Sequence, residues 1–399
     1  MMKLNVAVIF GGRSVEHEIS VLSALQCIAA LDKNKYQVIP VYISKQGQWY
    51  TGEKLLDLEN YRDLEQLTMQ SQKSIVNQNA SSGKICKESV GIFAKKQIAT
   101  IDVVFPVMHG THGEDGSLQG LFETMNIPYV GCDVLASAVT MDKVTTKMVL
   151  RSIGISVLDD VWFYAHEWIE AKDAVISKIK AKFNYPLIVK PGNLGSSVGV
   201  TAVNNDNELE DAVDLAVSMA QRILVEPKIT NLKEVNCAVL GDCELLEVSV
   251  CEEPIRVDAI LSYQDKYLSG TKNKFNATGS RSEGMSGAKR KIPAEISTAV
   301  SAKIQSLAKQ AFVALNCNGV VRIDFLIDQN TNEIYLCELN TIPGSLAFYL
   351  WEPMGMNFTA LTERLIALAL KRHRENNNLV VSYGTNILKN FKGLGGKSG

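Results

Sequence analysis

Three continuous apolar runs near the N-terminus constrain the fold more than any other feature of this 399-residue sequence. They are LNVAVIF (4–10), QVIPVYI (37–43) and IDVVFPV (101–107), and a helical pattern at 20–31 separates the first two. Runs without polar alternation are typical of a parallel sheet covered on both faces. We therefore expect an N-terminal α/β domain, with the polar residues 51–100 as a surface excursion outside its core.

A second pattern lies between Arg322 and Gly344, where the apolar runs VVRIDFLID and EIYLCELN flank the turn-forming residues QNTN. This arrangement predicts a β-hairpin. The hairpin carries Asp324, Glu338 and Asn340, and their oxygen atoms suit a hard cation such as Mg²⁺, which offsets the cost of burying carboxylates. The alternative is an exposed hairpin face with solvated acids. Because Mg²⁺ normally binds with substrate phosphates, the metal interpretation requires a nucleotide site elsewhere in the chain.

The stretch VKPGNLGSSVGV (189–200) is a candidate for that site. It places Lys190 at a strand end, before glycines and serines whose N–H and hydroxyl groups can surround a polyphosphate. It lacks the G-K-[ST] order of a Walker A loop, and a plain flexible loop is the alternative. The stretches ILVEP (223–227) and EVNCAV (234–239) are candidates for the adenine and ribose edge.

Two glycine-rich turns follow apolar strands. HGTHGEDGSLQG places His109 at the carboxyl end of a parallel strand, where α/β proteins bind ligands. GGRSVEHEIS precedes a helix whose N-terminal amides suit an anion, while Glu16 suits an ammonium group. The alternatives are that Glu114 and Asp115 only fix the turn and that Glu16 is one of the acidic residues common in a first helical turn.

Composition favours a small-molecule partner. Lys and Arg number 41 against 43 Asp and Glu, so nothing supports binding to nucleic acid or to a membrane surface. The 8 cysteines lack C-x-x-C spacing and indicate free thiols in a reducing compartment. No segment reaches the roughly 18 apolar residues of a membrane span. We expect a cytoplasmic protein without membrane segments.

Seven motifs in one order resemble those of the D-alanine–D-alanine ligases of the ATP-grasp superfamily. They are GGRSVEHEIS, HGTHGEDGSLQG, MDK, IVKPGNLGSSVGV, YQDKYLSG, RIDF and ELNTIPG. The resemblance implies an α/β multidomain fold, in which an ATP-grasp fold follows a Rossmann-like parallel-sheet domain. The expected parts are an N-terminal domain (1–130), a central subdomain (131–222), a C-terminal subdomain (223–375) with a mobile loop (262–287), and a flexible tail (376–399).

The resemblance also implies ATP-dependent ligation through an acylphosphate. The residues that match the ATP site are Lys143, Lys190, Ser196, Ser197, Glu226, Glu234 and Lys266, of which Lys266 lies on the mobile loop. Two Mg²⁺ ions, or Mn²⁺ in their place, are expected on Asp324, Glu338 and Asn340.

For the amino acids, Glu16 matches the residue that anchors the amine of the first D-alanine, with Ser196 and Tyr267 as its partners and His109 nearby. Arg322 and the backbone N–H of Gly344 match the groups that stabilise a tetrahedral oxyanion. A homodimer is the usual state of the family.

Two stretches depart from the family pattern. In SLAFYLWEP, the donors for the second substrate's carboxylate are expected between Ser345 and Tyr349. In EPKITNLKE, Pro227 has no N–H to offer adenine. The resemblance implies an amino acid rather than a hydroxy acid as acceptor, because Tyr267 stands where relatives that use D-lactate are expected to carry a histidine. D-alanine is the leading acceptor, the alternatives being D-serine, another amino acid, or a silent nucleotide-binding relative.

Overall fold

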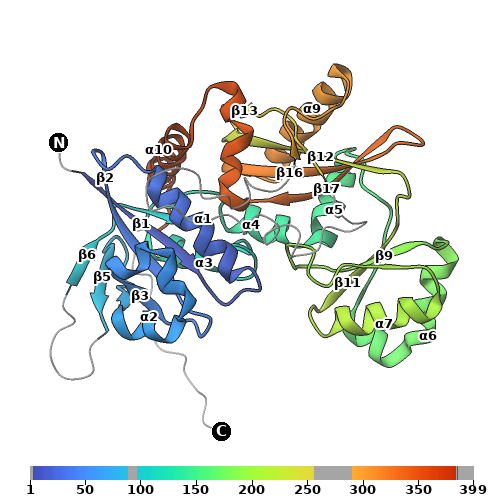
Figure 1. The fold of residues 1–399 in the computed structure, drawn as a ribbon, viewed down its shortest axis with the longest axis horizontal. Coiled ribbons are helices and arrows are strands. Elements are labelled where there is room, and N and C mark those ends of the chain that lie inside the picture. The colour runs from blue at the N-terminus through green and yellow to red at the C-terminus, as the bar shows by residue number, and fades with distance from the viewer. Residues whose placement is uncertain (1–2, 89–96, 256–289, 383, 385–399) are drawn as a thin grey trace, which may run out of the picture.

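The structure, a computed structural model, describes residues 3–88, 97–255, 290–382 and 384. Its N-terminal sheet has the strand order β6-β5-β4-β3-β2-β1-β7 (Figure 1). The three apolar runs form β1 (Leu4–Gly11), β2 (Tyr36–Ile43) and β7 (Val103–Pro106), and β1 pairs in parallel with β2 and β7. Helix α1 (His17–Ala30) connects β1 to β2 and packs on β1. The predicted parallel strands are confirmed.

The prediction that residues 51–100 lie outside the core was wrong. These residues extend the sheet in antiparallel fashion through β3 (Trp49–Thr51), β4 (Gln72–Val76), β5 (Lys84–Lys87) and β6 (Gln97–Thr100). Between β3 and β4 come η1 (Glu53–Leu56), η2 (Leu58–Arg62) and α2 (Leu64–Gln70). Leu55, Leu67 and Ile85 are buried. Antiparallel strands can keep one solvated face, so the polar residues there concealed the strands.

Three helices follow β7: α3 (Ser117–Met125), α4 (Val134–Met141) and α5 (Lys143–Ser152). The carboxylates of Asp133 and Asp142 cap α4 and α5, accepting hydrogen bonds from Ala136 N (2.8 Å) and Thr145 N (2.7 Å). The second cap makes Lys143 the first residue of α5, which is how the short MDK motif presents its lysine.

A second sheet is antiparallel throughout and has the order β10-β9-β11-β8. Its strands are β8 (Val161–Tyr164), β9 (Leu187–Pro191), β10 (Thr201–Val203) and β11 (Arg222–Pro227). Helices α6 (Ala165–Lys182) and α7 (Asp206–Val217) cover it and share a buried core with it. The glycine-rich stretch therefore lies between β9 and β10, as a loop at the edge of this sheet.

The third sheet has the order β13-β12-β16-β17. It comprises β12 (Leu232–Gly241), β13 (Leu246–Val248), β16 (Gly319–Asp328) and β17 (Glu333–Asn340), with α9 (Thr298–Ala314) packed on it. Strands β14 (Glu253–Pro254) and β15 (Arg290–Lys291) form a small separate pair. β16 and β17 are the predicted hairpin.

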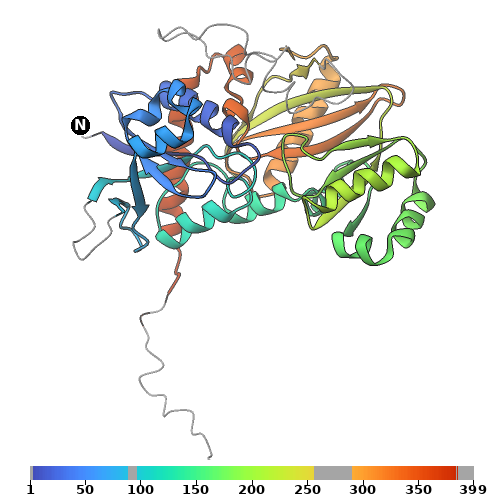
Figure 2. The same ribbon diagram turned by 60° about the horizontal axis from the view of Figure 1, so that its bottom comes forward.

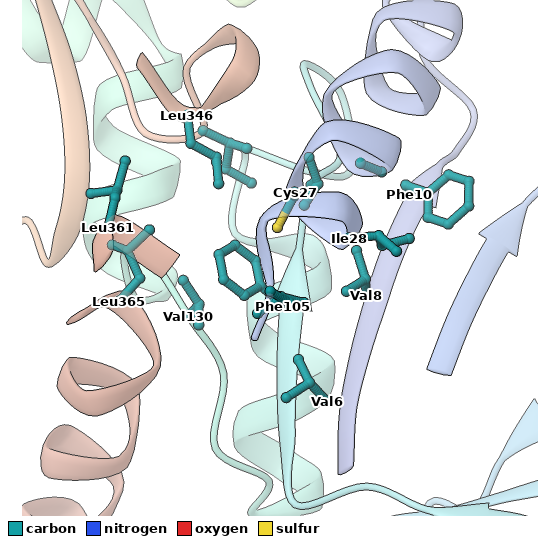
Figure 3. Close-up of a cluster of buried hydrophobic side chains, with 14 of the residues drawn as sticks. Val6, Val8, Phe10, Cys27, Ile28, Phe105, Val130, Leu346, Leu361 and Leu365 are labelled. Atoms are coloured by element: carbon teal, nitrogen blue, oxygen red, sulfur yellow. The ribbon is translucent and has the colours of Figure 1, made fainter. Parts of the chain in front are cut away.

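The chain returns to the N-terminal sheet after β17, through η4 (Gly344–Leu350), η5 (Glu352–Met354) and α10 (Phe358–Asn377). Figure 3 shows Leu346, Leu361 and Leu365 beside Phe105 and Val130 in one apolar cluster. The C-terminal elements therefore share a core with the N-terminal sheet, and the domain limits expected from the sequence stay a prediction.

The N-terminal sheet and the second sheet lie at opposite ends of the molecule, with the third sheet and helices α4 and α5 between them. Figure 2 shows the same arrangement after a turn of 60°. Within the described part of the chain, no helix is both long and apolar enough to cross a membrane. The candidate site residues are carried by all three sheets and by the loops that connect them.

Candidate active site

The hairpin places its predicted polar residues on one face. Asp324 lies opposite Glu338, and Arg322 lies opposite Asn340. Because residues two apart in a strand point to the same side, these four side chains share one face of the sheet. Glu234 on β12 pairs with Leu326, which puts Glu234 on that face as well.

Arg322 and Asp324 form a two-pronged ion pair within this face. Nε of Arg322 donates to Oδ1 of Asp324, and Nη2 donates to Oδ2, each over 2.7 Å. Burial alone would lower the pKa of Arg322, but the Asp324 carboxylate holds that pKa well above its usual value. Asn340 Nδ2 adds a 3.2 Å hydrogen bond to Asp324 Oδ2. The arginine is thereby oriented by an acid that was predicted as a metal ligand.

The donor set of the hairpin fits a hard cation. Asp324 and Glu338 offer two carboxylates and Asn340 an amide oxygen, while the side chains of Asp324 and Glu338 are 16% and 27% exposed. In the described ranges, no group of three or more His, Cys, Asp or Glu side chains is suited to a metal ion. Mg²⁺ does not need such a group, because it binds through one or two carboxylates and completes its coordination with water and phosphate.

Lys143 and Lys190 approach the hairpin from different elements. Nζ of Lys143 donates to the Leu194 carbonyl over 2.6 Å and lies 3.7 Å from Oε2 of Glu338. Lys190, on β9, forms an ion pair with Glu226 on β11, and that carboxylate raises the pKa of Lys190 against the effect of burial. Lys143 thus contacts the glycine-rich stretch at Leu194, and Lys190 precedes its glycines on β9.

Lys147 is a charged residue that sequence reasoning missed. Its Nζ forms an ion pair with Glu226 and lies 3.5 Å from Oδ1 of Asp160, and the Lys147 side chain is only 3% exposed. Burial would raise the pKa of Glu226, but Lys190 and Lys147 together lower it to about 2. Its position in the sequence could have indicated it, because Lys147 follows Lys143 by one turn of the amphipathic helix and lies on the same face.

A pocket lies where the N-terminal turns meet the hairpin. Its lining includes Glu16, Glu114, Lys143, Glu338 and Asn340. The Ser196 hydroxyl donates to the Glu16 carboxylate across this junction. Burial and the neighbouring Glu16 raise the pKa of Glu114 above its usual value. Residues far apart in the sequence thus form one acidic pocket with a lysine at its edge.

His109 is buried and has a protein partner at each ring nitrogen. Nδ1 lies 2.7 Å from the Ile342 carbonyl oxygen, and Nε2 lies 2.8 Å from Oγ of Ser23. Burial lowers the pKa of His109 to about 4, so its imidazole is neutral at pH 7. Its expected position near the first substrate stays a prediction, and the structure adds these two partners.

The segment after the hairpin has an unusual backbone. Gly344 is followed by Ser345, Leu346 and Ala347, whose φ angles of 52°, 53° and 50° are left-handed. Each costs a non-glycine residue roughly 1–2 kcal/mol relative to a right-handed conformation. Such strain persists only where the surrounding structure imposes it, and it is frequent at binding sites.

The predicted acceptor residues are buried. The Ser345 hydroxyl donates to Oε1 of Gln26 over 2.6 Å, and the Tyr349 hydroxyl donates to Oε1 of Glu252 over 3.2 Å. The Arg290 guanidinium lies 3.9 Å from the centre of the Tyr349 ring and also donates to Glu252 Oε2 over 2.8 Å. Glu252 and Arg290 were not anticipated, because no motif contains them.

Two groups of predicted residues stand apart. Ser197 lies in the loop between β9 and β10 with a positive φ of 59°. Lys266, Tyr267 and the whole loop 262–287 lie outside the described residues, so their expected roles remain predictions.

Comparison with known proteins identifies the family. Residues 5–132 match the family described as D-ala D-ala ligase N-terminus, and residues 149–367 match D-ala D-ala ligase C-terminus. A D-alanine–D-alanine ligase of Thermosipho melanesiensis is 40% identical over 386 residues, which cover 97% of this chain and 98% of the relative.

Solved structures agree. The D-alanine-D-alanine ligase from Coxiella burnetii is 31% identical with a TM-score of 0.77, covering 94% of this chain and 97% of that one. The VanG D-Ala:D-Ser ligase from Enterococcus faecalis is 32% identical with a TM-score of 0.75, covering 92% and 100%. The predicted ATP-grasp fold class is confirmed. The chain belongs to the D-alanine–D-alanine ligase family.

Proposed function

We propose that this chain joins two D-alanine molecules into D-alanyl-D-alanine at the expense of ATP, which supplies a precursor of peptidoglycan. The observation that carries the proposal is that one pocket is lined by Glu16, Lys143, Glu338 and Asn340. It combines a carboxylate for an amino group, a cation for phosphate and oxygen ligands for a metal ion. An ATP-dependent ligation needs these three groups in one place. Family membership supports the same conclusion.

The reaction has two steps. The carboxylate of the first D-alanine attacks the γ-phosphorus of ATP, which gives an acylphosphate and ADP. The amine of the second D-alanine then attacks the acyl carbon and loses a proton, and phosphate leaves. Glu16 accepts hydrogen bonds from the first substrate's ammonium group, and the Ser196 hydroxyl fixes the direction of that carboxylate.

The nucleotide end uses the second and third sheets. Lys143 and Lys190 bind phosphate oxygens, the loop with Ser196 and Ser197 adds further donors, and Glu226 and Glu234 hold the adenosine part. Lys190 is paired with Glu226 in the structure, so phosphate binding redistributes the contacts of this lysine.

Asp324, Glu338 and Asn340 would hold the divalent cations. Two Mg²⁺ ions, or Mn²⁺ in their place, would offset the charge that develops on the transferred phosphoryl group.

The second step places negative charge on the acyl oxygen. Arg322 and the Gly344 N–H stabilise that charge, and Asp324 keeps the guanidinium plane in a fixed orientation before the substrate binds. The acceptor's carboxylate lies near Ser345 and Tyr349. Lys266 and Tyr267, outside the described residues, complete the phosphate and first-substrate contacts in this proposal.

The decisive experiment supplies the purified chain with ATP, Mg²⁺ and a panel of D- and L-amino acids, and measures ADP release together with the dipeptide mass. We expect D-alanyl-D-alanine as the main product. A pocket separates amino acids that differ by one small group by only ~1–3 kcal/mol, so some D-alanyl-D-serine should also form. The likeness to a D-Ala:D-Ser ligase makes D-serine the necessary competitor.

Other outcomes have clear meanings. Dominant D-alanyl-D-serine would reassign the acceptor, and ATP binding without turnover would indicate a silent nucleotide-binding relative. The proposal places the chain as a homodimer in the cytoplasm, in keeping with its 8 free cysteines. Light scattering that gives a monomer mass would contradict the dimer.

A further inference from the structure

Both backbone polar groups of Ile342 are held by side chains from the N-terminal part of the chain. Its N–H donates to Oε1 of Glu114 over 2.8 Å, and its carbonyl oxygen accepts a hydrogen bond from Nδ1 of His109 over 2.7 Å. The other Glu114 oxygen, Oε2, accepts from Gly110 N over 2.8 Å. Glu114 therefore joins the His109 turn to the segment that follows the hairpin.

A series of hydrogen bonds continues from His109 to Ser345, the first of the three residues with left-handed φ angles. Since a carbonyl only accepts, the neutral His109 carries its proton on Nδ1, and Nε2 accepts from the Ser23 hydroxyl over 2.8 Å. The Ser23 oxygen in turn accepts from the Ser345 N–H over 3.0 Å. Each group in this series of hydrogen bonds acts as the donor or acceptor that its chemistry allows.

These contacts bracket Gly344. Ile342 is held two residues before it and Ser345 directly after it, and the three left-handed residues begin at Ser345. An unsupported chain would relax from this backbone, so the contacts from α1 and the His109 turn are what maintain it. The direction of the Gly344 N–H depends on the residues on either side.

We propose that Ser23, His109 and Glu114 are positioning residues that hold the segment 342–345 in the geometry required for addition of the second amino acid. The inference rests on the proposed function, because it concerns the oxyanion donor at Gly344. It assigns His109 the role of supporting the backbone, where the family resemblance placed it near the first substrate. Residues of the N-terminal domain thereby position the backbone that serves the second reaction step, on the C-terminal part of the chain.

Ser23 offers the cleanest test because a neighbouring serine provides a matched control. Ser20 is also buried on α1 and makes two hydrogen bonds, accepting from Gly11 N (2.8 Å) and donating to the Val107 carbonyl (2.5 Å). Neither bond of Ser20 reaches the segment 342–345. Ser23→Ala removes the acceptor of the Ser345 N–H, Ser23→Thr restores a hydroxyl, and Ser20→Ala removes an equal number of bonds elsewhere.

Small misplacements of catalytic groups cost on the order of 10- to 100-fold in rate, so we expect Ser23→Ala to lower kcat by that factor. The KM for ATP should stay within about twofold of wild type, since the nucleotide site lies on other elements. Ser23→Thr should recover most of kcat, and Ser20→Ala should retain it. Equal losses in Ser23→Ala and Ser20→Ala would attribute the effect to a loosened α1 and overturn the inference.

Amide hydrogen exchange provides a readout that does not depend on activity. Peptides covering 341–347 should exchange faster in Ser23→Ala and in Glu114→Gln than in wild type, and at the wild-type rate in Ser20→Ala. Unchanged exchange in both variants would overturn the inference. If the wild-type chain makes no dipeptide, the proposed function fails, whereas the exchange experiment still decides whether these residues hold the segment.

Discussion

Two clusters of charged side chains border the candidate site, and they differ in how their charges are compensated. Glu226 is 4% exposed and is flanked by Lys147 and Lys190. Asp324 and Glu338 on the hairpin are 16% and 27% exposed at their side chains. Two lysines surround the carboxylate of the first cluster, whereas in the second Glu338 lines the pocket and Asp324 pairs with Arg322.

In the proposed function, the charges of the first cluster mainly maintain the structure, whereas those of the second bind a cation. A buried carboxylate must keep its partners, because an uncompensated buried charge is strongly destabilising. Asp324 and Glu338 are only partly buried, so their carboxylates can bind a cation while Asp324 keeps its pair with Arg322. Lys190 and Glu226 belong to both descriptions, since they pair with each other and are also candidate ligands of the phosphates and of the adenosine part. Because Lys147 also pairs with Glu226, that carboxylate would keep one cation if Lys190 bound phosphate.

The largest effect is expected on the hairpin. Glu338→Gln should abolish ATP turnover, by on the order of 10³-fold or more, because an amide is a weaker ligand for a hard cation than a carboxylate. Unfolding in urea should remain close to that of wild type. Normal ADP release by E338Q with D-alanine present would show that Glu338 does not bind a required cation. The proposed difference in role between the two clusters would then be wrong.

The next effect concerns the buried cluster and is one of stability. Lys147→Met should lower the free energy of unfolding by ~3–5 kcal/mol, since it removes one of the two cations beside Glu226. Lys180→Met is the control, because Lys180 pairs with Asp206 at the surface, where such pairs contribute ~0–1 kcal/mol. Equal losses in urea unfolding would show that the Glu226 cluster is not specially dependent on its lysines.

The pH dependence of stability sharpens the comparison. The pKa of Glu226 is about 2 in the folded chain against the ordinary 4.5, so the unfolded state binds more protons between these values. The stabilisation is complete above pH 4.5 and is lost as pH falls toward 2. It amounts to at most roughly 3 kcal/mol. Urea unfolding of wild type and K147M across this pH range measures the stabilisation from ionised Glu226. In K147M this stabilisation should be smaller and should be lost at a higher pH than in wild type, because only Lys190 still lowers the pKa of Glu226.

The smallest effect is expected at Tyr349. Tyr349→Phe removes the hydroxyl that donates to Glu252, a bond of about 1 kcal/mol, and should raise the KM for the second amino acid by roughly fivefold. The KM for the first amino acid should not change. Kinetics that resolve the two amino-acid sites measure this, and an unchanged second KM would exclude Tyr349 from acceptor binding.

The sequence allowed the parallel strands and the hairpin to be predicted, because unbroken apolar runs and a polar turn are local signals. It did not reveal β3 to β6, because these strands are short and have few buried residues, and only their pairing in the folded sheet identifies them. Lys147 was overlooked for a related reason, since a lysine on an amphipathic helix looks solvated until β11 brings Glu226 to it.

By itself, the sequence determined the family, the order of the motifs and the kinds of side chain offered to ATP, metal and amino acid. These properties reside in residue identity and spacing. Only the tertiary structure decided which charged side chains pair with one another. It also decided that the side chains of Ser23, His109 and Glu114 hydrogen-bond to the backbone of Ile342 and Ser345. Such contacts join residues up to 322 positions apart, and their geometry follows from the packing of whole elements rather than from any local pattern.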